Sequence, residues 1–215
     1  MVRRLHETGQ AAPIYITMVA GLLFLALAFF AVGQAGATRN GAQSAADAAA
    51  LAAAQESRDA FLLGDLLDPG HLDDIFNGNP IGTADGCAAA TRFADQNKAD
   101  VDVDAGGCGR IGGFRWGFTV HVITQEPMGD SVLPGTGNEK ARAQATAIVT
   151  SRCSFEPAED EEEPSDGGDE DEPGDDKPVS PGELDCGGTK WPIDPEHLDR
   201  LPSLADLFSV RLAQD

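Results

Sequence analysis

IYITMVAGLLFLALAFFAV, residues 14–32, is the stretch that decides the fold of this chain. Its 19 residues include no charged side chain, and as a helix they extend about 28 Å, close to the ~30 Å hydrocarbon thickness of a bilayer. The chain continues as RNGAQSAADAAALAAAQESRD, residues 39–59, where the side chains become small. We therefore expect one long helix with a bulky apolar front half and a small-residue back half.

Basic residues flanking the apolar run predict its orientation. Arg3 and Arg4 precede it, and Arg39 is the nearest cation behind it. Because cytoplasmic flanks carry the excess of Lys and Arg, we expect a single-pass protein of the cell membrane with a cytoplasmic N-terminus and an extracellular C-terminal domain. The alternative is a cleavable secretory signal, for which residues 35–37 offer an A-x-A-like site.

The residues on both sides of the run carry a family resemblance. GQAAP, residues 9–13, and RNGAQSAADAAALAAA, residues 39–54, resemble the N-terminal region of TadE/TadG-like proteins of the tight-adherence (Flp) pilus system. The resemblance implies a membrane-anchored, pilin-like component that acts beside other pilus-assembly proteins. The sequence differs from processed prepilins, which are cleaved after a glycine and carry a glutamate at the fifth residue after it. The fifth residue after Gly9 is Ile14, so the sequence leaves processing before Gln10 open.

The alanine-rich segment suits assembly independently of the resemblance. Alanine is the best helix former, and small side chains allow helices to approach closely. We expect Ala46 and Ala50 to present a small-residue face to another pilin-like helix or to the assembly platform. Arg39, Gln43 and Asp47 recur every four residues and form one polar ridge. Asp47 either pairs with a cation of a partner or is simply solvated.

The charge of the chain excludes some partners. The formal net charge is −21, and aromatic residues make up 6% of the chain, so its core must be small. Fourteen acidic residues and one cation, Lys177, lie between Glu156 and Glu183, so this stretch carries −13 of the total. An acidic exterior without a basic patch argues against nucleic acid and against anionic lipid headgroups as ligands.

The four cysteines predict disulfides. All lie on the expected outer side, and no two of them have the spacing of zinc ligands. Of the three possible pairings we favour Cys87–Cys108 and Cys153–Cys186. The second would close the base of the acidic stretch, where a loop of roughly 30 residues contributes about 3–4 kcal/mol in the chain-entropy model.

Between the stem and the acidic stretch we expect a small antiparallel sheet. A short helix is expected over residues 88–97, with Phe93 and Ala94 facing inward. Val101 and Val103 alternate with aspartates, and residues 114–122 alternate aromatic or aliphatic with other residues, as half-buried strands do. Residues 141–149 also alternate, although their alanines leave a helix possible. The expected fold class is α+β with a pilin-like helix and a small disulfide-bonded head.

For the residues beyond 155, the sequence predicts an acidic disordered insert followed by a C-terminal amphipathic helix. The insert is rich in Pro and Gly and too polar to bury a core. Asp194-Pro195 resembles a helix start, and Ser203-x-x-Asp206 resembles a capping box. Leu204, Leu207, Phe208 and Leu212 would then form one apolar face that docks on the head or binds a partner.

Motifs for catalysis are missing from the sequence. It has no nucleophile elbow, zinc-protease helix, phosphate-binding loop or dinucleotide fingerprint, and its four histidines are scattered. Asp100-x-Asp102-x-Asp104 fails as a calcium loop, because Ala105 stands where an EF-hand needs glycine. We expect no enzyme, no cofactor, no metal site and no small-molecule substrate.

These observations divide the chain into a cytoplasmic N-terminus (1–13), a transmembrane helix (14–36), a stem helix (37–63), an α+β head (64–155), the acidic insert (156–183) and a C-terminal helical segment (184–215). The favoured function is a structural or assembly component of a Tad/Flp-type pilus or a related secretion machine, acting by helix packing from the membrane. The alternative is a secreted or anchored binding and adhesion module that uses the acidic insert to attract cations.

Overall fold

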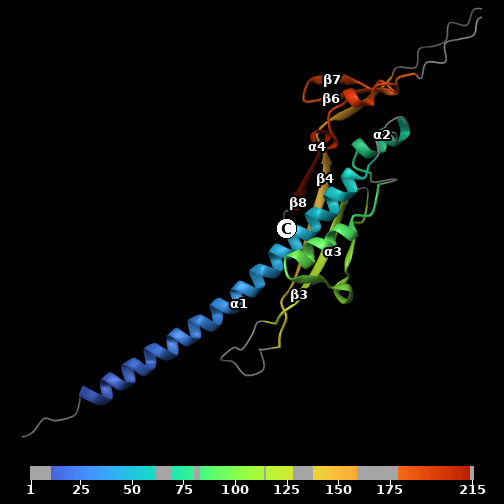
Figure 1. Cartoon of the computed structure of the whole chain (residues 1–215). Coiled ribbons are helices and arrows are strands. Elements are labelled where there is room, and N and C mark those ends of the chain that lie inside the picture. Colours follow the sequence, from blue (N-terminus) through green and yellow to red (C-terminus); the bar gives the residue numbers. More distant parts are fainter. Residues whose placement is uncertain are drawn as a thin grey trace, which may run out of the picture.

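The computed structural model describes residues 11–61, 69–79, 83–113, 115–127, 138–158 and 179–213. Its longest element is α1, Ala11–Asp59, a single helix of 49 residues. Figure 1 shows the front half of α1 projecting away from the other elements, whereas its back half lies along them. We call the described residues from 61 onward the head. The prediction of one long helix across both sequence stretches is confirmed.

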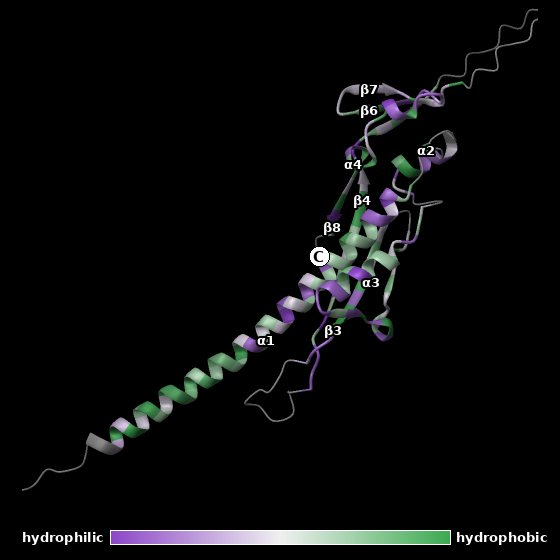
Figure 2. Ribbon diagram, in the orientation of Figure 1, coloured by the Kyte–Doolittle hydropathy of each residue, from purple (hydrophilic) through white to green (hydrophobic). Residues whose placement is uncertain are grey.

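The front half of α1 is an exposed apolar cylinder. Figure 2 colours most of it as hydrophobic, and bulky side chains such as Phe24 and Phe29 are about three-quarters exposed, at 73% and 75%. Among the described residues, α1 is the one helix long and apolar enough to cross a membrane. Lipid or other apolar helices must cover such a surface, because an uninterrupted apolar face of this size is unfavourable in water.

Two antiparallel sheets form the head. The larger has the order β1-β3-β4-β8, and β2 pairs with β3 beside β1. Its strands are β1 (Ala99–Val101), β2 (Cys108–Arg110), β3 (Gly117–Thr124), β4 (Arg142–Ser151) and β8 (Phe208–Leu212). The smaller has the order β5-β6-β7, with β5 at Ser154–Pro157, β6 at Gly182–Cys186 and β7 at Thr189–Pro192.

The back half of α1 packs on one face of the larger sheet. The alternation of β3 and β4 puts their apolar side chains on that face: Phe118, Val120, Val122, Ala145, Ala147 and Val149 are buried. Helix α3, Cys87–Gln96, lies against α1 as well (Figure 1). Its N-terminus comes very close to α1, since a Cβ built on Gly86 would lie 1.9 Å from the carbonyl oxygen of Ala53. Small residues on α1 make this two-sided packing possible.

An aromatic cluster closes the end of the core where α1 stops. Helix α2, Pro69–Phe76, supplies Phe76, and the residues after α1 supply Phe61. Trp116 and Phe208 complete the cluster, with ring centroids 5.3 Å apart, and Phe76 stacks on Phe208 at 5.2 Å. The core therefore draws on the beginning, middle and end of the described chain.

The α+β class and its central strands are confirmed. The alternating stretch after Phe114, which itself lies outside the described residues, forms β3. Residues 141–149, which the sequence left open between strand and helix, lie in β4 except for Ala141, because pairing with β3 and β8 outweighs the helix propensity of alanine.

Two local predictions in the head are wrong. Val103 does not continue a strand: it is 78% exposed and begins a 3₁₀ turn, η2 (Val103–Ala105). Asp102 ends the strand by accepting a hydrogen bond from the Ala105 amide, and Gly106 at φ 123° turns the chain. Phe93 is 40% exposed, whereas Ala94 is buried as predicted.

The predicted C-terminal amphipathic helix is also wrong. Its residues form a 3₁₀ turn, η3 (Leu198–Arg200), a four-residue helix, α4 (Leu204–Leu207), and the strand β8. The edge of β4 offers unpaired backbone groups, and the period-two pattern of Phe208, Val210 and Leu212 suits a strand on it as well as a helix. The expected docking on the head does occur, through buried Leu207 and Phe208.

Both ends of the predicted disordered insert are ordered. Glu156 and Pro157 lie in β5, and Gly182 and Glu183 lie opposite them in β6. The Ala158 amide donates to the carbonyl of Pro181 at 3.1 Å and continues this ladder. Backbone pairing thus defines a base for the acidic stretch, whose residues 159–178 lie outside the described part of the chain.

Candidate functional site

The exposed apolar front half of α1 is a candidate interaction surface. Gly21, Gly33 and Gly36 lie on it, and a Cβ built on any of them would meet no atom of the chain within 4 Å. Gly33 and Ala37 are both exposed and, being four residues apart, share one face of the helix. Small side chains at this spacing let a second helix approach closely within a membrane.

The residues that we predicted to pack against a partner do not share the exposed environment of the front half of α1. Gly9 and Gln10 lie outside the described residues. Ala46 and Ala50 have no exposed surface, because the chain's own head covers them. The small-residue face that we expected to meet a partner is thus occupied within the chain. After Ala42, the first fully buried alanine of the helix, one face of α1 is covered by the head, so the front half offers a partner the more exposed surface.

The predicted polar ridge is formed in part. Gln43 donates through Nε2 to the Asp47 carboxylate at 2.8 Å, the i to i+4 contact that the spacing predicts. The same nitrogen lies 3.3 Å from the backbone carbonyl of Gln144 in β4, so the ridge also ties the stem to the sheet. Arg39, one turn earlier, is exposed, and its side chain has no hydrogen-bond or ion-pair partner among the described residues.

A cavity of about 550 Å³ opens where the front half of α1 meets the head. We call it the junction cavity. From α1 it is lined by Val32, Ala35, Gly36 and Arg39, and from the other side by Arg142, the first residue of β4, and the two residues before it, Lys140 and Ala141. Sequence reasoning missed Lys140 and Arg142, because only the tertiary fold brings the start of β4 next to Arg39.

The two disulfides have the favoured pairing. Cys87–Cys108 joins the first residue of α3 to β2, and Cys153–Cys186 joins the turn after β4 to β6. The second bond attaches the smaller sheet to the larger one. Both bonds fit an oxidising compartment, which agrees with a head on the outer side of the membrane.

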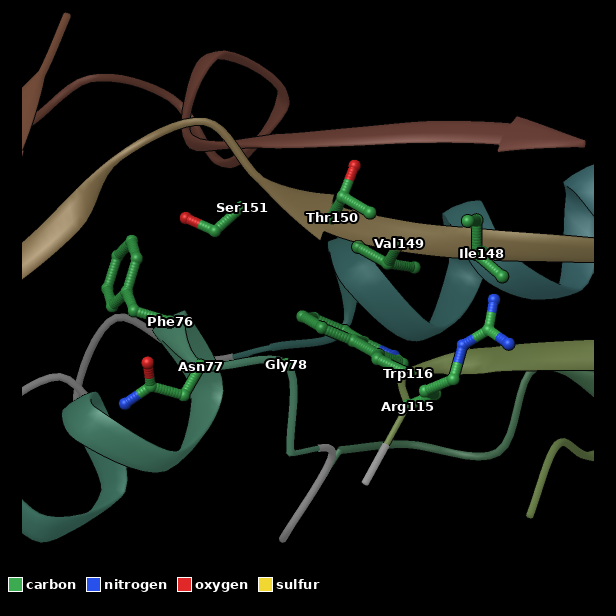
Figure 3. A pocket seen from close by; sticks show the side chains of 9 residues that line it. All are labelled: Phe76, Asn77, Gly78, Arg115, Trp116, Ile148, Val149, Thr150 and Ser151. Atoms are coloured by element: carbon green, nitrogen blue, oxygen red, sulfur yellow. The ribbon is translucent and has the colours of Figure 1, made fainter. Parts of the chain in front are cut away.

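A second cavity, of about 280 Å³, lies beside Trp116 at the far end of the head. Figure 3 shows Phe76 and Asn77 on one side of it, and Arg115, Trp116 and residues 148–151 on the other. Its described lining contains no carboxylate, histidine or cysteine, and the Ser151 hydroxyl donates to the backbone carbonyl of Cys153. This arrangement provides no base to activate a nucleophile.

Charged groups of the smaller sheet pair with one another. Lys190 Nζ donates to the Glu156 carboxylate at 2.9 Å and also to that of Glu183. The Lys190 hydrogen bond and charge hold the pKa of Glu156 below its ordinary range, and Glu183 and Glu156 together raise the pKa of Lys190. These exposed contacts organise the base of the acidic stretch.

Asp194, Glu196 and His197 form a second polar cluster, whose ligand atoms lie within 4.8 Å of one another. The backbone amide of Glu196 lowers the pKa of Asp194, and His197 Nδ1 lies 2.9 Å from the same carboxyl group. Arg200 approaches it at 4.0 Å. The contacts that Asp194 makes with Glu196, His197 and Arg200 account for the cluster, which forms part of the turn that precedes η3.

Comparison with known proteins found one similarity, in the N-terminal segment. Residues 9–56 match the family described as putative Flp pilus-assembly TadE/G-like. No curated protein and no solved structure matches the chain. The matched residues include the exposed front half of α1 and most of the alanine-rich segment that packs on the head. Residues 9–56 of this chain are therefore similar to TadE/G-like Flp pilus-assembly proteins, and the expected resemblance is confirmed over these residues.

Proposed function

We propose that this protein is a membrane-anchored assembly component of a Tad/Flp-type pilus or a related secretion machine. The apolar front half of α1 anchors the chain and packs beside the apolar helices of other pilin-like or pilus-assembly proteins. The disulfide-bonded head lies outside the membrane. In this role the protein acts by position and contact, and no step of chemistry is assigned to it.

The continuity of α1 is the observation that supports this proposal best. One unbroken helix of 49 residues contains both the exposed apolar half and the buried alanine-rich half. A helix of this length spans about 74 Å, and its back half is fixed to the sheet and to α3. Any displacement of the membrane half is therefore passed on to the head, as an assembly component requires.

The mechanism is lateral packing of a partner helix against α1 at Gly33 and Ala37. Gly33 and Ala37 leave room for a second backbone, and neither has a role in the described fold of this chain. Replacing both with leucine keeps α1 apolar and helical, so anchoring is preserved. The added bulk would block close approach by a partner helix.

The experiment compares this double variant, Gly33→Leu with Ala37→Leu, with a matched control, Gly21→Leu. A side chain at Gly21 also meets no atom of the chain within 4 Å, but Gly21 lies about 120° around the helix from Gly33 and so on another face of α1. In cells that contain the native assembly proteins, we expect the double variant to remain in the membrane and to lose recovery of pilin-like partners and surface fibres. The control should behave like the wild type.

Normal partner recovery and normal fibres with the double variant would contradict lateral packing at this face. The mass of the mature protein from its native membrane addresses processing separately. A start at Met1 supports a permanent anchor, and a start at Gln10 supports prepilin-type processing. A start near Thr38 would remove the front half of α1 and overturn the proposal.

A further inference from the structure

The junction cavity combines an apolar wall with three cations. Val32, Ala35 and Gly36 form the wall on α1, and Arg39 stands at its outer end. Lys140 and Arg142 come from the start of β4, about 100 residues later in the sequence. No carboxylate belongs to the described lining of this cavity.

The cations retain capacity to bind an anion. The side chains of Arg39 and Lys140 have no ion pair or hydrogen bond within the described part of the chain. Arg142 donates from Nε to Asp102 at 2.7 Å, and its side chain is 64% exposed. A guanidinium has further N–H donors in the same plane, so this pairing fixes Arg142 without using all of its donors.

The position of the cavity along α1 sets its depth in a bilayer. The apolar run ends at Val32, and Arg39 follows seven residues later, about 10 Å further along the helix axis. Helical side chains lean towards the N-terminus, so the Arg39 side chain extends back towards the membrane. The headgroup layer adds roughly 5–8 Å on each side of the hydrocarbon core. The cations therefore lie at the depth of lipid phosphates.

We propose that the junction cavity binds the headgroup of an anionic phospholipid of the outer leaflet. The phosphate contacts Arg39, Lys140 and the remaining donors of Arg142, while the acyl chains run along the apolar wall below Val32. This inference rests on the membrane-anchored placement proposed above. A bound lipid would fix the start of β4 against α1 and so set the distance of the head from the membrane surface.

The acidic composition of the chain does not oppose this binding. Of the net charge of −21, −13 lies between Glu156 and Glu183. In Figure 1 the base of that stretch, in β5 and β6, is at the end of the head farthest from the front half of α1. Salt screens charges beyond about 8–10 Å, so the cations nearest the headgroup dominate. The argument from net charge against anionic lipids thus fails at this site.

The test uses the full-length protein in non-ionic detergent, with native mass spectrometry to measure lipid retention. The probes are phosphatidylglycerol and phosphatidylcholine with the same acyl chains. The variant is Arg39→Gln with Lys140→Gln, and the control is Arg115→Gln with Arg152→Gln, an equal charge change at the far end of the head. All four side chains belong to exposed residues, and non-reducing gels verify that both disulfides form in each protein.

We expect the wild type and the control to retain phosphatidylglycerol in preference to phosphatidylcholine. The Arg39 and Lys140 variant should retain phosphatidylglycerol at least about tenfold more weakly, since each cation near a lipid phosphate changes binding about fivefold. Equal retention by the variant and the wild type would overturn the proposal. So would displacement of the lipid by inorganic phosphate, which would indicate a small-anion site instead.

Alkaline extraction of membranes separates this inference from the proposed function. Wild-type protein that stays in the membrane but shows no phosphatidylglycerol preference overturns the lipid site alone. Wild-type protein that is released by alkali overturns the anchored placement and the lipid site with it.

Discussion

The indole Nε1 of Trp116 donates a hydrogen bond of 3.0 Å to the hydroxyl of Ser57. Ser57 in turn donates to the backbone carbonyl of Ala84 at 2.7 Å, and both side chains are buried. The Ser57 hydroxyl, near the end of α1, thus connects Trp116, directly before β3, with Ala84 in the segment before α3. This chain of two hydrogen bonds satisfies a buried donor and fixes where the head sits on the helix.

Replacing Ser57 with alanine should destabilise the head by about 1–3 kcal/mol, because the buried indole N–H and the Ala84 carbonyl lose their partner. Denaturant unfolding followed by tryptophan fluorescence measures this change. Ser44→Ala is the matched control, since Ser44 is an exposed serine of the same helix. Equal midpoints for the two variants would show that the hydrogen bonds contribute nothing net.

Replacing Gly86 with alanine should force α3 away from α1, because the new Cβ would lie 1.9 Å from the Ala53 carbonyl oxygen. We expect a loss of about 1–3 kcal/mol in the free energy of unfolding, as for other overpacked contacts. Gly109→Ala provides the comparison, because a Cβ there meets no atom within 4 Å. A Gly86 variant as stable as the Gly109 variant would contradict the close approach of the two helices.

Replacing both Cys153 and Cys186 with serine should loosen the smaller sheet. The bond spans 33 residues, so the chain-entropy model assigns it about 3–4 kcal/mol. Amide hydrogen exchange should accelerate in β5, β6 and β7, including around buried Leu184, while β3 remains protected. The corresponding pair of replacements at Cys87 and Cys108 should act at α3 and β2 instead. Uniform acceleration across both sheets would indicate a single cooperative unit.

Replacing Lys190 with glutamine should raise the pKa of Glu156 towards its ordinary range, because the hydrogen bond and positive charge of Lys190, the largest causes of its lowering, are removed. A lowered carboxyl pKa stabilises the fold above the ordinary glutamate pKa, and this contribution disappears as pH falls through the lowered value. NMR titration of the Glu156 side-chain carboxyl measures the shift. A titration midpoint that Lys190→Gln leaves unchanged would rule out the pair as its cause, and Lys98→Gln serves as the charge-matched control.

Replacing residues 159–178 with an equally long Gly/Ser segment should leave partner recovery and fibres intact. The replacement preserves β5 and β6 at the base of the acidic stretch and the hydrogen bond between Ala158 and Pro181. Surface adhesion and divalent-cation binding are the discriminating measurements. Loss of adhesion with normal fibres would favour the alternative function of a binding module.

The sequence alone determined the elements whose local patterns are strong. An uncharged run of 19 residues followed by alanines allows little other than one long helix, and strict alternation after Phe114 required a strand. The cysteine pairing that the sequence favoured among three possible ones is the pairing that the structure has. The family resemblance rested on contiguous residues, so no tertiary information was needed to detect it.

The tertiary structure alone decided where competing local preferences were balanced. The segment from Phe208 to Leu212 fits a helix or a strand, and pairing with the open edge of β4 selected the strand, whereas Leu204–Leu207 stayed helical as α4. Ala46 and Ala50 carry no information about which neighbour they meet, and the chain's own head proved to bury them. That Arg39 and Lys140 line one cavity could likewise not be predicted from the sequence. Local propensity acts over a few residues, whereas burial and strand pairing join residues that are far apart in the chain.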